Sequence, residues 1–381
     1  MSAPPGDPGY RRRRNATGAI RFDLRKPDRE RVSPDKSVSF SDTNVWIVEE
    51  IGILLDGSEV ADSELASWIA GIRADPGASC ADTGVQALRA GAENRARSRP
   101  AGPPLPFVKD LVTDQGTPVR LYRPVLDPRP LVLFLHGGGF VFGDLNSHDE
   151  ICRRLSLRAD AAVLAVDYKR APEHPGPAAV QDAVAAVSWA SKHLPELGSS
   201  DDYGIGLAGD SAGAAIALLA AVQLAAVQPV AGQPVGGSLT ASALLLAYPN
   251  TDMTLSRPSI TEKGRGWGLD ETDLAWFIEQ WVPVQTRRDD PSISPLHASL
   301  EGLPATMLIT AEHDPLRDEG EALVAALKAS RVRVQHRRET GLVHGFLGLS
   351  HISPAADRSA DQLFTEFGGY LRQAISGQYT T

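Results

Sequence analysis

The 381-residue sequence has only two cysteines, Cys80 and Cys152, and neither has a partner cysteine or histidine at metal-ligand spacing. They therefore indicate free thiols in a reducing compartment. Patterns such as H-x-x-x-H or clustered cysteine and histidine are also missing, which argues against a metalloenzyme. We expect no metal and no other cofactor.

Long apolar runs are missing too. No stretch approaches the roughly 18 consecutive apolar residues of a membrane span, and no apolar segment of a signal peptide follows the basic N-terminal residues. We therefore expect a cytoplasmic protein that does not enter a membrane. The net charge is −9, and such an acidic balance argues against nucleic acid as the main partner.

Positive charge is concentrated at the start of the chain. Residues 1–40 contain ten lysines and arginines against five acidic residues, including four consecutive arginines at 11–14. Interspersed Pro, Gly and Asp, without an apolar face, predict a disordered and solvated basic tail. The alternative is an anchor for an anionic surface.

Helical periodicity follows in three segments, at residues 43–55, 62–74 and 82–98. Because these helices precede the proline-rich linker at 99–106, we expect residues 41–105 to form N-terminal cap helices. The remaining residues, 106–381, are expected to form the core.

Strand and helix patterns alternate through the core, which begins with two paired strands at 107–113 and 117–124. Continuous apolar strands alternating with helices predict an α/β fold, with a mostly parallel sheet covered on both faces. Further strands are expected at 130–136, 161–168, 203–209, 240–249, 305–314 and 332–339, and helices at 147–159, 177–194, 214–225, 318–330 and 356–376. An insertion at about 250–290, rich in turns and aromatic residues, interrupts this alternation and is expected to belong to the cap.

The sequence GDSAG places Ser211 between a predicted strand and a predicted helix, with Gly209 and Gly213 on either side. A nucleophile on a sharp strand-to-helix turn requires this arrangement, because the backbones approach closely there. The alternative is that Ser211 is a small residue which only allows close packing.

The other parts of an acyl-transfer site occur in the chain order Ser, Asp, His. Asp314 follows a predicted strand, and His344 follows the last one; Asp318 and Glu319 are weaker candidates for the acid, and His351 for the base. The glycine run in HGGGF can expose backbone N–H groups, so Gly138, Gly139 and Ala212 are the candidate oxyanion donors. His136 is expected to be structural.

Taken together, these motifs resemble the hormone-sensitive-lipase-like α/β-hydrolases, the bacterial family IV carboxylesterases. The resemblance spans about residue 80 to the C-terminus and includes GDSAG at 209–213 and DPLRDEG at 314–320, with HGGGF at 136–140, DYKRAPEHP at 167–175 and HGF at 344–346. It implies the α/β-hydrolase fold with a helical cap, a Ser211–Asp314–His344 triad, the oxyanion donors named above, and in many members a homodimer.

The sequence therefore predicts a serine carboxylesterase for short to medium acyl chains, acting on a small-molecule ester or amide through an acyl-enzyme. Phe140, Asp210 and Trp267 are assigned to the substrate pocket. A deacetylase or amidase acting on an acylated specialised metabolite is the alternative, because it uses the same chemistry. A non-catalytic small-molecule receptor is disfavoured because the base, His344, is present.

Overall fold

The computed structural model describes residues 45–46, 55–56, 60–226 and 241–377. The chain divides into Met1–Thr43 and Asn44–Thr381, and only the second unit contains described residues. The predicted basic tail at 1–40 therefore lies outside them. Cys80 and Cys152 are both free, as predicted. No helix in these ranges is both long and apolar enough to cross a membrane.

Within the described ranges, an eight-stranded sheet has the order β10-β9-β8-β7-β5-β6-β4-β3. Neighbouring strands are parallel except at β4, which runs antiparallel to both β3 and β6. The predicted mostly parallel sheet is therefore confirmed. Its strands are β3 (Phe107–Val112), β4 (Pro118–Arg123), β5 (Leu131–Leu135), β6 (Ala162–Val166), β7 (Ile205–Asp210), β8 (Ala243–Ala247), β9 (Ala305–His313) and β10 (Val334–Val343).

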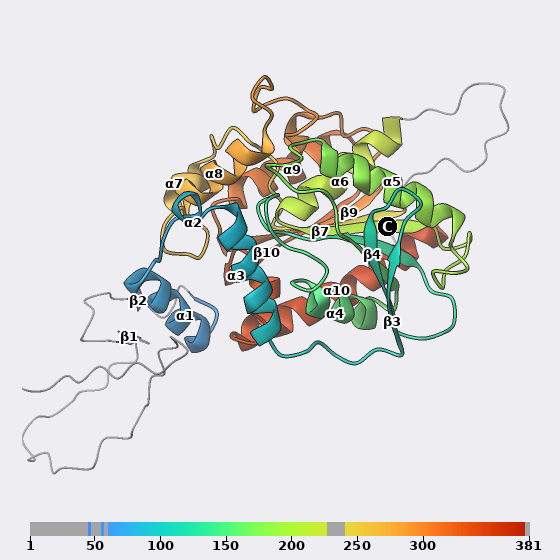
Figure 1. Cartoon of the computed structure of the whole chain (residues 1–381), viewed down its shortest axis with the longest axis horizontal. Coiled ribbons are helices and arrows are strands. Elements are labelled where there is room, and N and C mark those ends of the chain that lie inside the picture. The colour runs from blue at the N-terminus through green and yellow to red at the C-terminus, as the bar shows by residue number, and fades with distance from the viewer. Residues whose placement is uncertain (1–44, 47–54, 57–59, 227–240, 378–381) are drawn as a thin grey trace, which may run out of the picture. The chain divides into compact units, whose positions relative to one another are not determined.

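The sheet separates two hydrophobic layers. On β5, Leu131, Leu133 and Leu135 belong to one layer, whereas Val132 and Phe134 belong to the other, because successive side chains of a strand point to opposite faces. Helices α5, α6 and α9 lie on the first face, and α4 and α10 lie on the second (Figure 1). These helices are α4 (Asp149–Ala159), α5 (Ala178–Lys192), α6 (Ala212–Ala226), α9 (Arg317–Ala329) and α10 (Pro354–Ser376).

The helix predicted over residues 43–55 is wrong at both of its described ends. There, β1 (Val45–Trp46) pairs antiparallel with β2 (Leu55–Asp56). Residues 47–54 lie outside the described residues. Valine and tryptophan both favour extended backbone. Hydrogen bonding between the two strands therefore outweighs the helical pattern of the apolar residues.

The other N-terminal helices are present. The first begins after Asp62, whose side chain accepts a hydrogen bond from the Leu65 N–H at 2.8 Å. The same carboxylate accepts hydrogen bonds from the Ser353 hydroxyl and the Ala355 N–H, which tie this helix to the start of α10. The N-terminal helices are α1 (Ser63–Ala74), α2 (Cys80–Thr83) and α3 (Val85–Ser98).

The insertion after β8 contacts these N-terminal helices directly. Arg73 donates a hydrogen bond to the Gly266 carbonyl at 3.0 Å, and the Cys80 N–H donates one to Asp273 at 2.7 Å. The expected division into cap (41–105 with about 250–290) and core stays a prediction, which these contacts favour. The insertion contains α7 (Pro258–Glu262) and α8 (Glu271–Trp281), and a 3-10 helix, η1 (Pro295–His297), follows it.

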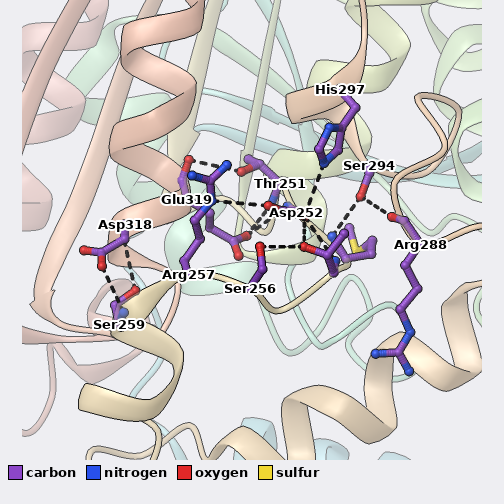
Figure 2. Close-up of polar contacts among 12 residues, drawn as sticks. Thr251, Asp252, Ser256, Arg257, Ser259, Arg288, Ser294, His297, Asp318 and Glu319 are labelled. Carbon is purple, nitrogen blue, oxygen red and sulfur yellow. Dashed lines mark hydrogen bonds and ion pairs between the residues drawn. The ribbon is translucent and has the colours of Figure 1, made fainter.

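A buried carboxyl group on α9 holds the chain that follows β8. Glu319 is fully buried, and its Oε1 accepts hydrogen bonds from the backbone N–H groups of Thr251 and Asp252 (Figure 2). It also accepts one from the Asn250 side chain. The Asn250 N–H also donates to the Ser211 carbonyl at 3.4 Å. Glu319 therefore positions a segment that lies directly beside Ser211.

Side-chain contacts extend this network into the insertion. Asp252 is buried, and its carboxylate is paired with Arg257 and His297, each at 3.3 Å (Figure 2). The Ser259 N–H donates to Asp318 at 2.9 Å. The start of α9 and the insertion are thus joined by buried polar contacts, which require defined geometry because an unpaired buried polar group is destabilising.

Replacing Glu319 with glutamine is expected to change how stability depends on pH. Burial raises the pKa of Glu319 to about 8, although the hydrogen bonds from Thr251, Asp252 and Asn250 oppose this shift. The folded state therefore retains a proton that the unfolded state has lost above about pH 5. Folding then becomes less favourable as the pH rises from about 5 to 8. Glu319→Gln keeps an oxygen acceptor but does not titrate.

The free energy of unfolding, measured by urea denaturation between pH 5 and 9, should fall by roughly 2–4 kcal/mol more in the wild type than in Glu319→Gln. The control is Glu321→Gln, on the same helix, where the carboxylate pairs with Arg338 at the surface. If the free energy of unfolding changes with pH in the same way in the wild type and in Glu319→Gln, the raised pKa of Glu319 is contradicted.

Candidate active site

Ser211 occupies the tight turn between β7 and α6, with a φ of +53°. Two glycines permit this turn: an added Cβ would lie 2.0 Å from the Leu135 carbonyl oxygen at Gly213, and 2.5 Å from the backbone of Gly213 at Gly209. The Ser211 N–H donates a hydrogen bond to the Ala247 carbonyl at 2.9 Å. The turn is therefore held by backbone contacts that exclude side chains on both sides.

Two hydrogen bonds connect Ser211, His344 and Asp314. His344 Nε2 lies 2.9 Å from Ser211 Oγ, and His344 Nδ1 lies 2.8 Å from Asp314 Oδ2. A carboxylate only accepts hydrogen bonds, so His344 donates from Nδ1, and its Nε2 is left to accept the serine proton. Asp314 is fully buried, and its other oxygen accepts the Leu316 N–H at 2.8 Å.

Strand ends bring these three residues together. Ser211, Asp314 and His344 directly follow β7, β9 and β10, whose carboxyl ends meet at one edge of the sheet because the strands are parallel. Gly345 follows His344 with a φ of +72° and turns the chain into a 3-10 helix, η2 (Phe346–Leu349). The Tyr248 ring packs edge-on against the imidazole, with centroids 4.9 Å apart.

The glycine run after β5 leaves backbone N–H groups free beside Ser211. Gly138 and Gly139 have positive φ values of 124° and 58°. An added Cβ would lie 2.2 Å from the Phe142 carbonyl oxygen at Gly138, and 2.5 Å from the Phe277 ring at Gly139. Within the part of the chain that the structure describes, the N–H groups of Gly138, Gly139 and Ala212 have no protein acceptor.

Asp210 anchors this loop from the strand that carries Ser211. The carboxylate is buried; it accepts the Gly137 N–H at 2.8 Å and pairs with His148 Nε2 at 3.4 Å. Burial by itself would raise the pKa of Asp210, but His148 and the Gly137 N–H together hold it below its usual value. Asp210 is therefore ionised at neutral pH, as a carboxylate that orients a backbone N–H should be.

His136 has the structural position that the sequence predicts for it. Its Nδ1 lies 2.9 Å from the Gly137 carbonyl oxygen, and its ring stacks on Tyr168 with centroids 4.3 Å apart. Burial lowers the pKa of His136 to about 3, with the neighbouring His148 adding to the effect. The ring is therefore neutral, and its contact with the Gly137 carbonyl supports the glycine loop that follows β5.

A cavity of about 380 Å³ opens onto these groups. Of the predicted site residues, Ser211, His344, Gly138, Gly139, Ala212, Phe140 and Asp210 line it. Phe140 is itself buried and stacks on Trp281, with centroids 4.2 Å apart. The cavity is also lined by residues that the sequence motifs do not indicate: Arg95, Arg99, Phe142, His148, Asn250 and Leu274.

Trp267, the remaining pocket candidate, lies elsewhere. Its ring stacks on His313, with centroids 4.0 Å apart and an interplanar angle of 9°, and Arg73 lies over it at 4.5 Å. It is not among the residues that line the cavity. Trp267 thus packs α1 and the insertion against the residue before Asp314, an arrangement that depends on contacts between distant segments.

Comparison with known proteins agrees with this geometry. The sequence profile of the alpha/beta hydrolase fold matches residues 132–348. Carboxylic ester hydrolase LipN of Mycobacterium tuberculosis is 38% identical over 262 residues, which cover 67% of each chain. Carboxylesterase NlhH of the same organism is 38% identical over 277 residues, which cover 69% of this chain and 84% of NlhH.

Solved structures give the same result. A hyperthermophilic esterase from Pyrobaculum calidifontis is 34% identical with a TM-score of 0.69, and the match covers 76% of this chain and 94% of the esterase. An ester hydrolase from the metagenome of Lake Arreo is 28% identical with a TM-score of 0.73, covering 82% and 99% of the two chains. The chain therefore belongs to the alpha/beta hydrolase fold family, and within that family to the carboxylesterases.

Proposed function

We propose that this carboxylesterase cleaves esters of short to medium acyl chains with Ser211 as nucleophile, His344 as base and Asp314 as the acid that orients the base. The observation that carries the proposal is the pair of hydrogen bonds through His344, at 2.9 Å to Ser211 and 2.8 Å to Asp314. This geometry is what transfer of the serine proton requires.

In the proposed reaction, His344 Nε2 takes the proton of Ser211 Oγ as the oxygen attacks the ester carbonyl. The same proton then passes from His344 to the leaving alcohol, and an acyl-enzyme ester forms on Ser211. In the second half of the reaction, His344 deprotonates a water molecule, which attacks the acyl-enzyme carbonyl. His344 then returns the proton to Ser211 Oγ as the carboxylic acid product is released. Asp314 stabilises the imidazolium that forms in each half and does not itself become protonated.

The N–H groups of Gly138, Gly139 and Ala212 are the proposed donors to the oxyanion. Their lack of an acceptor among the described residues supports this role, because an oxyanion hole must be organised before the charge develops. Ala212 also begins α6, where the helix dipole favours a negative charge. Asp210 acts as a positioning residue, because it holds the Gly137 N–H and hence the course of the glycine loop.

The proposed acyl length follows from the size and lining of the cavity. A volume of about 380 Å³ is at the small end of ligand pockets. Phe142, Leu274 and Phe277 give it an apolar wall.

We also propose that the N-terminal helices and the insertion act as a cap, and that Phe140 and Asp210 support the pocket. The family resemblance and the composition further lead us to propose a cytoplasmic homodimer.

Ser211→Ala is expected to lower kcat at least about 10⁴-fold, because the acyl-enzyme can no longer form. Hydrolysis of 4-nitrophenyl esters from acetate to dodecanoate measures this and also sizes the acyl pocket. Ser191→Ala, which removes a hydroxyl from α5 away from the site, is the control. Activity of Ser211→Ala within ten-fold of the wild type would exclude Ser211 as nucleophile.

Asp314→Asn is expected to lower kcat by about 10⁴-fold with little change in KM, because an amide favours the wrong tautomer of His344. Asp318→Asn is the matched control, since Asp318 also lies in DPLRDEG but its carboxylate accepts hydrogen bonds from the Ser259 N–H and from Arg317. Its kcat should stay within a few-fold of the wild type. If Asp318→Asn is the damaging change and Asp314→Asn is not, the assignment of the acid is wrong.

A further inference from the structure

Two arginines from α3 reach the cavity that holds Ser211. Arg95 lies in the last turn of the helix and Arg99 caps its end, with the Arg99 N–H donating to the Arg95 carbonyl at 3.1 Å. Both side chains line the cavity together with Ser211 and His344. Arg99 is half-buried, and Arg95 is exposed.

Neither guanidinium has a hydrogen bond or an ion pair with another residue in the described ranges. Their neighbours on the same helix differ: Arg89 makes a bidentate pair with Glu173, and Arg97 pairs with Glu93. A partly desolvated cation without a partner is destabilising, unless a ligand supplies the opposite charge.

The charges around Arg99 strengthen this argument. Burial lowers the pKa of Arg99, and repulsion from Arg95 lowers it further; Glu150 and Asp210 act in the opposite direction. Each carboxylate near the pair already has a partner, since Glu150 binds Arg154, Asp210 binds Gly137 and His148, and Asp273 binds the Cys80 N–H.

Arg99 also packs against η2, the 3-10 helix that follows the proposed base. Gly348 in η2 lies four residues after His344, and an added Cβ there would be 3.6 Å from Arg99 Nη2. The guanidinium therefore packs against the backbone of η2, and a side chain at position 348 would reduce the space that it occupies. The apolar side chains of Phe142, Leu274 and Phe277 line the same cavity.

The end of a helix provides a simpler explanation for basic residues, because cations there interact favourably with the helix dipole. This explains Arg97, which is exposed at the surface. It does not explain why Arg99 turns into the cavity. Arg99 also borders a separate surface hollow of about 370 Å³. The alternative to ligand binding is therefore that water in this hollow hydrates the guanidinium.

We propose that the natural substrates are esters that carry a carboxylate, and that Arg99, assisted by Arg95, binds this group. A guanidinium matches a carboxylate with two parallel hydrogen bonds. The apolar wall then receives the uncharged part of the substrate. This proposal rests on the proposed esterase function, because it assigns the substrate class of the same cavity.

The test compares each carboxylate ester with its uncharged amide analogue by pH-stat titration. Monoethyl glutarate and ethyl 5-amino-5-oxopentanoate place the group on the acyl side; 4-acetoxybenzoate and 4-acetoxybenzamide place it on the alcohol side. In at least one pair, the wild type should show a kcat/KM at least about ten-fold higher for the carboxylate member. Arg99→Gln should bring this ratio close to one, by raising KM for the carboxylate member more than for the uncharged member.

Arg97→Gln is the matched control, because it removes the same charge from the same helix at the surface; it should leave the ratio unchanged. Equal rates for both members of both pairs in the wild type would overturn the proposal while leaving the esterase function intact. If Arg99→Gln changes kcat/KM equally for both members of each pair, the proposal is also overturned and the esterase function is kept. That result would favour a structural role for Arg99, with its guanidinium hydrated from the surface hollow. Failure of the folded wild type to hydrolyse 4-nitrophenyl acetate and all four esters would instead overturn the proposed function.

Discussion

The site depends on how closely α6 packs against the end of β5. At Gly213 the helix backbone approaches the Leu135 carbonyl so closely that no side chain fits, and Gly209 meets the same glycine from the other side of the turn. Between these two glycines Ser211 adopts a positive φ, and its Oγ lies 2.9 Å from His344 Nε2. The same close packing also sets the position of the Ala212 N–H, so the proposed nucleophile and one proposed oxyanion donor share a single constraint.

The parallel sheet converts this local constraint into a site. Ser211, Asp314 and His344 are far apart in sequence, but each follows a strand whose carboxyl end lies at the same edge. Because β8 lies between β7 and β9, the chain leaving β8 also enters the site. Glu319 holds that chain through hydrogen bonds to Asn250 and its two successors. The buried network thus connects the start of α9, which closely follows Asp314, to the turn that carries Ser211.

The core supplies one part of the candidate site, and the N-terminal helices together with the insertion supply another. Strand ends of the core carry the proposed reacting groups, whereas α3 supplies positive charge and α8, in the insertion, supplies apolar surface through Leu274 and Phe277. This division means that substrate preference can change through the helices while the backbone contacts around Ser211 stay the same. Arg73 and Asp273 hold the two helical segments together, so their contributions to the cavity are coupled.

The sequence by itself determined the order of core strands and helices, and the motifs that surround Ser211, Asp314 and His344. These features depend on local backbone: apolar periodicity, glycines where side chains cannot fit, and residues that directly follow strands. Only the tertiary structure decided the pairing of β1 with β2, the stacking of Trp267 on His313 and the entry of Arg99 into the cavity. Each of these depends on contacts between residues distant in the chain, which local patterns do not encode.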